Sequence, residues 1–315
     1  MESFLFTVNA LVPTFAIVIL GYILKRCGLF TKEFLNVANK LCFRVALPCL
    51  LFKNISQFGI EGFLKGPYII FAAVCIIIIV VLLMLFIPKI VSDRRKCGSM
   101  VQGIFRSNYI ILGIPIVANM FGEEHMASAS ALVPISIIVF NFLAVMVLSY
   151  FSREKDVNAF SWDMVKNIIT NPLIIASLIG VIYEMLPVKL PNILYKPISD
   201  LASIATPLAL LTVGGQFEFK TVISNKKELS IAVIGRLIVV PLIFLSIAIM
   251  LGYKGADLAP LIVLFGGPTA VSSYVMAKDM DCDSDLAAQI IIFTTLFSMA
   301  SLFGWVFLLK GMNYL

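Results

Sequence analysis

Histidine and charged residues are both scarce in this sequence. Its 315 residues include one histidine, His125, and only 13% of them are charged. The six cysteines form no Cys-x-x-Cys pair, so we expect neither a disulfide framework nor a zinc site. No Ser/His/Asp set, Walker loop or His-rich cluster is present. The sequence therefore predicts no enzyme, no catalytic residue, no metal and no cofactor.

Apolar residues dominate instead. They make up 60% of the chain, more than the surface of a soluble protein of this length tolerates. Many windows of about 20 residues are nearly uncharged, which is long enough for a helix to cross a bilayer. We predict an all-α polytopic membrane protein with ten transmembrane helices, over residues 5–24, 34–56, 67–88, 99–121, 126–151, 168–186, 193–216, 229–252, 257–278 and 284–309.

Lysine and arginine set the predicted orientation. Fourteen of them fall in loops on one side of the predicted helices and six on the other. The richer side is cytoplasmic by the positive-inside rule, which places both termini on the extracytoplasmic side of the cell (plasma) membrane. The longest polar connector gives the predicted division into a first half (1–151), a cytoplasmic linker (152–167) and a second half (168–315).

The two halves share an internal repeat. Each half holds five predicted helices, and because five is odd the second half enters the membrane in the opposite sense. This pattern predicts two inverted five-helix repeats, typical of secondary transporters, with ten unrelated helices as the alternative. Six positions recur at offsets of 159 and 153 residues: Pro13/Pro172, Gly21/Gly180, Ala46/Ala205, Pro48/Pro207, Pro88/Pro241 and Pro115/Pro268.

Two predicted helices are interrupted at mid-membrane depth. Gly113-Ile114-Pro115 breaks the fourth and Gly266-Gly267-Pro268 breaks the ninth. Proline removes a helical hydrogen bond, and backbone groups freed in lipid need partners inside the protein. A half-helix starting near each proline directs free N–H groups and a positive dipole end toward the membrane centre, where they attract an anion. Two tolerated kinks without a ligand are the alternative.

Uncharged polar residues stand around both breaks. Their hydroxyl and amide groups can hold a carboxylate or coordinate a small cation. Hydrogen bonding between helices is the alternative role, and the usual one in membranes. We predict substrate-binding residues at Asn108, Tyr109, Gly113, Pro115, Ser136, Asn141, Gly267, Pro268, Thr269 and Ser272.

Charged residues inside the predicted helices are rarer and more informative about function. Arg106 and Arg236 lie about two turns from the inner end of their helices, so they either line a positive inner vestibule or snorkel to the cytoplasmic surface. Asp200 is a candidate proton carrier, cation ligand or partner of Arg44. All four are candidates for electrostatic or ion-coupling roles, with H⁺ or Na⁺ as the coupling ion.

Several strings resemble the auxin efflux carrier family over nearly the whole chain. The segment Ser107–Pro115 looks like that family's Pro-Asn-Thr…Gly-Ile-Pro crossover string, and Asn171-Pro172 is similar to its Asn-Pro…Gly pattern. Asn39, Pro48, Ser199-Asp200, Arg236 and Ala277-Lys278-Asp279 also fit. The family includes plant auxin exporters and bacterial carriers of malonate and related organic acids.

The resemblance implies a fold of the sodium/proton antiporter-like and bile acid symporter-like kind, with crossed discontinuous helices 4 and 9. It implies a scaffold domain from helices 1, 2, 6 and 7 and a transport domain from helices 3–5 and 8–10. Family binding residues carry over to Asn108, Asn141 and the crossovers at Pro115 and Pro268. The short linker, and Ser107 in place of a family proline, favour a small dicarboxylate or another organic acid over auxin.

These features predict a secondary transporter that moves a small organic anion, a carboxylate, across the membrane by alternating access. The substrate is expected at the crossing of helices 4 and 9. The expected partners are that organic acid and the lipid bilayer, with no nucleic acid, and a homodimer stays open. The alternatives are a cation/proton antiporter of the same architecture, which usually needs acidic residues at the crossing, and a non-transporting membrane ligand sensor.

Overall fold

The computed structural model describes residues 16–58, 66–109, 117, 126–152, 166, 169–186, 190–217 and 219–315. Nearly all of these residues are helical. In the first half, a helix over 16–26 is followed by α2 (Lys32–Leu41), a π-helical turn η1 (Cys42–Ala46), α3 (Leu47–Phe58), α4 (Pro67–Ile90), α5 (Arg94–Phe105), α7 (Met126–Ala131) and α8 (Val133–Phe151).

The second half is also helical. Its elements are α10 (Pro172–Met185), α11 (Asn192–Gln216), α12 (Phe219–Ser224), α13 (Lys226–Ile234), a second π-helical turn η4 (Gly235–Val239), α14 (Val240–Met250), α15 (Leu258–Gly266), α16 (Ser272–Asp279) and α17 (Ser284–Gly311).

Several helix starts follow directly from the sequence. The side chains of Thr31, Asp93, Asn171 and Asp283 accept hydrogen bonds from backbone N–H groups in the first turns of α2, α5, α10 and α17. Such N-caps satisfy donors that have no partner within the helix. Asn171 is followed by a proline at the first helical position, where a missing N–H costs nothing.

The prediction of an all-helical membrane protein is confirmed. Five helical stretches in the described part of the chain are long and apolar enough to cross a membrane, and the two parts of α17, bent by 43°, make a sixth. Their outward faces are apolar; in α4, for example, Ile70, Ile77 and Leu85 are exposed. Lipid tails cover such faces at no cost, so these residues need no protein partner. Ten spans and the inverted repeat stay predictions.

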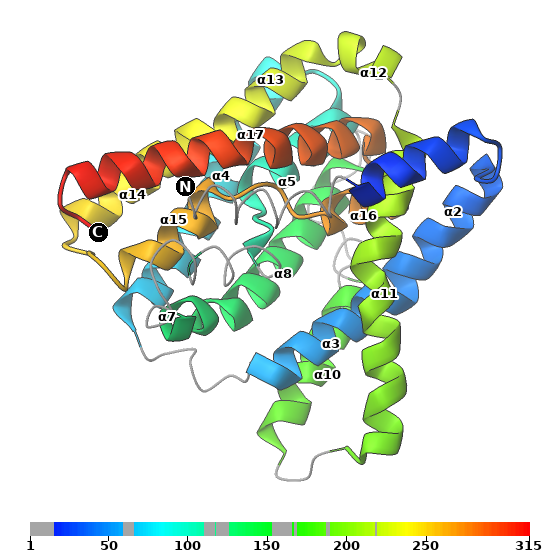
Figure 1. Ribbon diagram of the computed structural model, residues 1–315, viewed down its shortest axis with the longest axis horizontal. Helices are drawn as coiled ribbons and strands as arrows, with labels where there is room; N and C mark the ends of the chain where they lie inside the picture. Colours follow the sequence, from blue (N-terminus) through cyan, green and yellow to red (C-terminus); the bar gives the residue numbers. More distant parts are fainter. Residues whose placement is uncertain are drawn as a thin grey trace.

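The helices form two groups. In one, α3 packs chiefly against α10 and α11, with α2 and η1 beside them, and we call this the α3 group. In the other, α5 packs against α4, α8, α13 and α17, and α14 packs against α15; we call these helices, with η4 and α16, the α5 group. Figure 1 shows the α3 group on the right of the molecule and most of the α5 group on the left.

Both interrupted helices differ in detail from the sequence-based prediction. Helix α5 ends at Phe105, so its interruption begins ahead of Gly113. Helix α15 ends at Gly266 as expected, but α16 starts only at Ser272 rather than next to Pro268. The delay has a physical reason, because the residues between them use their backbone groups to bind another segment instead of forming a helical turn.

Candidate functional site

Two extended segments, far apart in the sequence, pair where α5 and α15 end. Ser107 and Thr269 form an isolated antiparallel bridge. The backbone N–H of Asn108 donates to the carbonyl of Pro268 over 2.8 Å, and the N–H of Ala270 donates to the carbonyl of Arg106 over 3.1 Å. Backbone groups freed by the two helix ends therefore satisfy each other, as a membrane interior requires.

Thr269 also makes hydrogen bonds outside this pairing, and they fix its position. Its backbone N–H donates to the Thr294 hydroxyl over 3.1 Å, and its own hydroxyl donates to the Gly103 carbonyl over 2.6 Å. Thr269 and Thr294 are both fully buried. The segment between α15 and α16 is thus anchored to both α5 and α17.

Arg236 lies beneath the two helix ends. It is fully buried in η4 and donates from its guanidinium to four backbone carbonyls: Gly267 (2.7 Å), Leu264 (2.8 Å), Ile104 (3.1 Å) and Phe105 (3.3 Å). The last carbonyls of a helix lack intrahelical partners and carry its negative dipole end. One cation therefore caps the C-terminal ends of α5 and α15 together.

Arg106 binds side chains instead of backbone carbonyls. It follows the last residue of α5 and is only 5% exposed. Its Nη2 donates to the Asn141 side-chain oxygen over 2.6 Å, and its Nη1 donates to the Met276 sulfur. No acidic side chain pairs with it within the described ranges, where the salt bridge found joins Lys96 and Glu228. A buried cation without a counter-ion is costly unless an anion approaches it.

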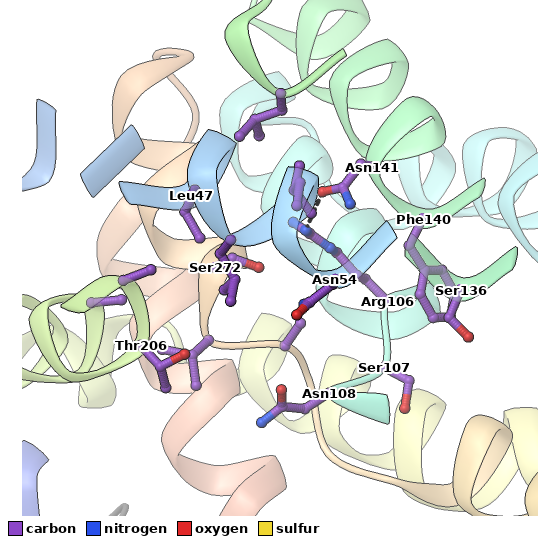
Figure 2. Close-up of a pocket in the computed structure, with 17 residues that line it drawn as sticks. Leu47, Asn54, Arg106, Ser107, Asn108, Ser136, Phe140, Asn141, Thr206 and Ser272 are labelled. Atoms are coloured by element: carbon purple, nitrogen blue, oxygen red, sulfur yellow. Dashed lines mark hydrogen bonds between the residues drawn. The ribbon is translucent and has the colours of Figure 1, made fainter. Parts of the chain in front are cut away.

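Arg106 lines a cavity of about 260 Å³ between the two helix groups. Figure 2 shows the labelled polar side chains around this space. The α5 group supplies most of the polar groups, and the α3 group supplies a wall that is largely apolar. The lining residues are Leu47, Leu50, Leu51, Asn54, Arg106, Ser107, Asn108, Ser136, Phe140, Asn141, Leu173, Ala205, Thr206, Ala209, Ala270, Val271 and Ser272.

The structure brings together five of the residues singled out in the sequence. Asn108, Ser136, Asn141 and Ser272 line the cavity with Arg106. Both Arg106 and Arg236 are buried inside the protein, so neither snorkels to the cytoplasmic surface.

Other predicted residues lie close by but do not line the cavity. Tyr109 is fully buried and donates its hydroxyl to the Ala129 carbonyl over 2.9 Å. Pro268 and Thr269 take part in the backbone pairing described above, and the carbonyl of Gly267 accepts a hydrogen bond from Arg236. Gly113 and Pro115 lie outside the described residues.

Asp200 and Arg44 are not part of this site. Both are exposed, and they form no ion pair with each other. Arg44 instead lines a second cavity of about 590 Å³, together with Asn171 and Asp279. Burial raises the pKa of the Asp279 carboxyl, and the nearby positive charges of Arg44 and Lys40 oppose that rise.

Sequence reasoning missed Asn54 and Thr206, the polar residues that the described part of the α3 group contributes to the cavity. Asn54 stood two residues from the expected end of its helix at residue 56, where a polar side chain is ordinary. It also missed Met276 and Gln102. When the Gln102 amide is oriented to satisfy its neighbours, its oxygen accepts from Arg106 Nη1 over 3.2 Å and its nitrogen donates to the Ser273 carbonyl.

Membrane-spanning helices, paired helix interruptions and a polar cavity between two helix groups are features of a polytopic membrane transporter. Residues 6–306 match the sequence profile of the family described as "Membrane transport protein", and the chain belongs to this family. It is the family of the auxin efflux carriers, as the sequence motifs predicted. The chain is therefore a transporter and not an enzyme.

The chain is similar to several transporters along almost its full length. It is 26% identical to "Uncharacterized transporter MJ1031" of Methanocaldococcus jannaschii, over 93% of this chain and 96% of the relative. It is 24% identical to an "Uncharacterized transporter" of Methanothermobacter thermautotrophicus, over 96% of this chain and 98% of the relative. It is 23% identical to the "Putative malonate transporter" of Rhizobium meliloti, over 95% of this chain and 94% of the relative.

Proposed function

We propose that this protein moves a small organic anion, a mono- or dicarboxylate, across the membrane, with the anion bound beside Arg106. The observation that supports this most strongly is the buried Arg106 guanidinium, which lines a cavity and has no acidic partner in the described part of the chain. Asn141 and Met276 hold the guanidinium in place, so it needs no large rearrangement to accept a carboxylate.

The neighbouring groups suit the same ligand. Ser136 and Ser272 add hydroxyl groups to the cavity, and Asn108 adds an amide. Leucine side chains of α3 and Phe140 supply apolar surface for the carbon skeleton of an organic acid. The name of the Rhizobium relative makes malonate the first compound to test.

We propose that transport occurs by alternating access between the two helix groups. In this proposal the α3 group, which holds predicted helices 2, 6 and 7, belongs to the scaffold domain, and the α5 group belongs to the transport domain. The crossing of helices 4 and 9 is then the pairing of residues 106–108 with 268–270.

Uptake into liposomes tests the proposal. Purified protein in liposomes should show saturable uptake of at least one compound from a panel of malonate, succinate, acetate and butyrate. An absence of both uptake and binding across the panel would overturn the proposal. Proton or sodium flux without any organic anion would instead favour a cation/proton antiporter. Binding without counterflow of labelled ligand would favour a sensor.

A further inference from the structure

Asn54 carries an unsatisfied polar group at the cavity. It lies on α3 and is 7% exposed, and its side-chain nitrogen has no hydrogen-bond partner within the described residues. A buried donor without an acceptor costs free energy, so it points to an acceptor that is bound only part of the time. Asn54 also lines the cavity that contains Arg106.

The surroundings of Asn54 make this donor unusual. Among the residues that the structure describes, seven others of the α3 group line the cavity, and Thr206 is the only other polar one of these. The opposite wall presents Arg106, Asn108 and Asn141. Asn54 is therefore the amide that the described part of the α3 group contributes to the cavity containing Arg106, and Figure 2 labels both residues among those that line it.

We propose that Asn54 is a second anion-binding residue, which donates a hydrogen bond to the carboxylate that Arg106 attracts. This inference rests on the proposed function. A carboxylate has two oxygens and several lone pairs, so it accepts from a guanidinium and from an amide at the same time. The terminal torsion of asparagine is broad, and a turn about that bond presents the amide nitrogen to the cavity.

An anion held by both residues also affects transport. Arg106 belongs to the α5 group and Asn54 to the α3 group, so an anion bound by both residues bridges the two groups. The bridged state then has an interaction that the empty protein lacks. Anion binding therefore shifts the equilibrium toward the arrangement of the α3 and α5 groups in which both residues contact the anion. Asn54 also favours ligands with acceptor oxygens over apolar ligands of the same size, because only an acceptor satisfies its N–H.

Calorimetric titration of the purified protein with malonate and with butyrate tests this role. Asn54→Leu keeps the approximate volume but removes the donor, and we expect about a tenfold loss of affinity for the carboxylate that the unchanged protein binds. The ligand-free variant should unfold at the same temperature as the parent or higher, because it no longer buries an unsatisfied group. Asn54→Asp places a negative charge in the cavity, where it repels a carboxylate, and should weaken binding further.

Asn39 provides the matched control. It is 1% exposed and also carries an unsatisfied side-chain atom, but it does not line the cavity. Asn39→Leu should leave affinity unchanged, and an equal loss in both leucine variants would overturn the proposal. Unchanged affinity in Asn54→Leu, with binding by the parent protein intact, overturns the role of Asn54 and leaves the proposed function standing. If the parent binds neither acid, the proposed function fails and this role fails with it.

Discussion

Arg106 and Asn141 are joined by a hydrogen bond of 2.6 Å between the guanidinium Nη2 and the side-chain oxygen. Arg106 follows the end of α5, whereas Asn141 lies within α8, and both residues line the same cavity. Asn141 in turn donates from its amide nitrogen to the Ile137 carbonyl over 2.6 Å, which fixes the orientation of the amide. The cation is therefore held in one position before any ligand arrives.

Replacement of Arg106 separates binding from stability. Arg106→Met should lower carboxylate affinity at least tenfold, since hydrogen bonds to a charged group contribute about 1.5–3 kcal/mol. The ligand-free protein should be as stable as the parent or more so, because a buried charge without a counter-ion is removed. Titration calorimetry and thermal unfolding measure the two effects. Arg26→Gln, at an exposed arginine, is the control. Carboxylate uptake at the parental rate by Arg106→Met would rule out Arg106 as the anion site.

Replacement of Arg236 should have the opposite effect on stability. Arg236→Met leaves four buried carbonyls without their donor, and each such loss costs about 1–3 kcal/mol. We expect the free energy of unfolding to fall by at least about 3 kcal/mol. Arg236→Lys should recover only part of it, because an ammonium group lacks the fork of the guanidinium. Thermal unfolding in detergent compares the series, and an undiminished melting temperature in the methionine variant would contradict the capping role.

The contact between the helix over 16–26 and α11 depends on glycine. A Cβ atom on Gly214 would lie 1.9 Å from the Val18 carbonyl oxygen, whereas a Cβ on Gly304 would meet nothing within 4 Å. Gly214→Ala should therefore destabilise the protein by about 1–3 kcal/mol, the usual cost of overpacking, because backbone cannot move aside as a side chain can. Gly304→Ala, also within a helix, should be neutral or slightly stabilising. Thermal unfolding distinguishes the two, and equal melting temperatures would contradict the close approach.

Asp279 should make the folding stability of the protein depend on pH, in a direction that its raised pKa determines. Burial raises its pKa above the ordinary value of 3.8, against the attraction of Arg44 and Lys40. The folded state thus favours the protonated carboxyl of Asp279. The stabilisation from this protonation is fully present below the ordinary pKa, and it is lost as pH rises through the raised pKa of the folded state. Asp279→Asn stays neutral, so it should be more stable than the parent at neutral pH.

The advantage of Asp279→Asn should shrink as pH falls through the raised pKa of Asp279 toward the ordinary value of 3.8. Thermal unfolding measured across pH 4–8 follows this change. A variant of Asp279 that is less stable than the parent at neutral pH would mean that the ion attraction outweighs burial.

Much of the site was predictable because polar residues are conspicuous in apolar segments. Asn108, Asn141 and Arg106 were found in this way, and the structure places all three around one cavity. Asn54 was missed because it stands near the expected end of its helix. Periodicity along one helix cannot show that the end of α3 faces the α5 group instead of water. The pairing of Ser107 with Thr269 was equally hidden, since an isolated bridge between two helix interruptions leaves no pattern in the sequence.

Sequence alone identifies the chain as a helical membrane protein, assigns its family, and shows that its helices are interrupted near polar residues. Composition and local motifs carry that information, because lipid accepts only long apolar helices and breaks in them need partners. The different contacts of the two arginines become visible only in the folded molecule. Arg236 binds backbone carbonyls from two helices, while Arg106 lines a cavity, and this difference depends on which groups converge on each guanidinium from distant parts of the chain.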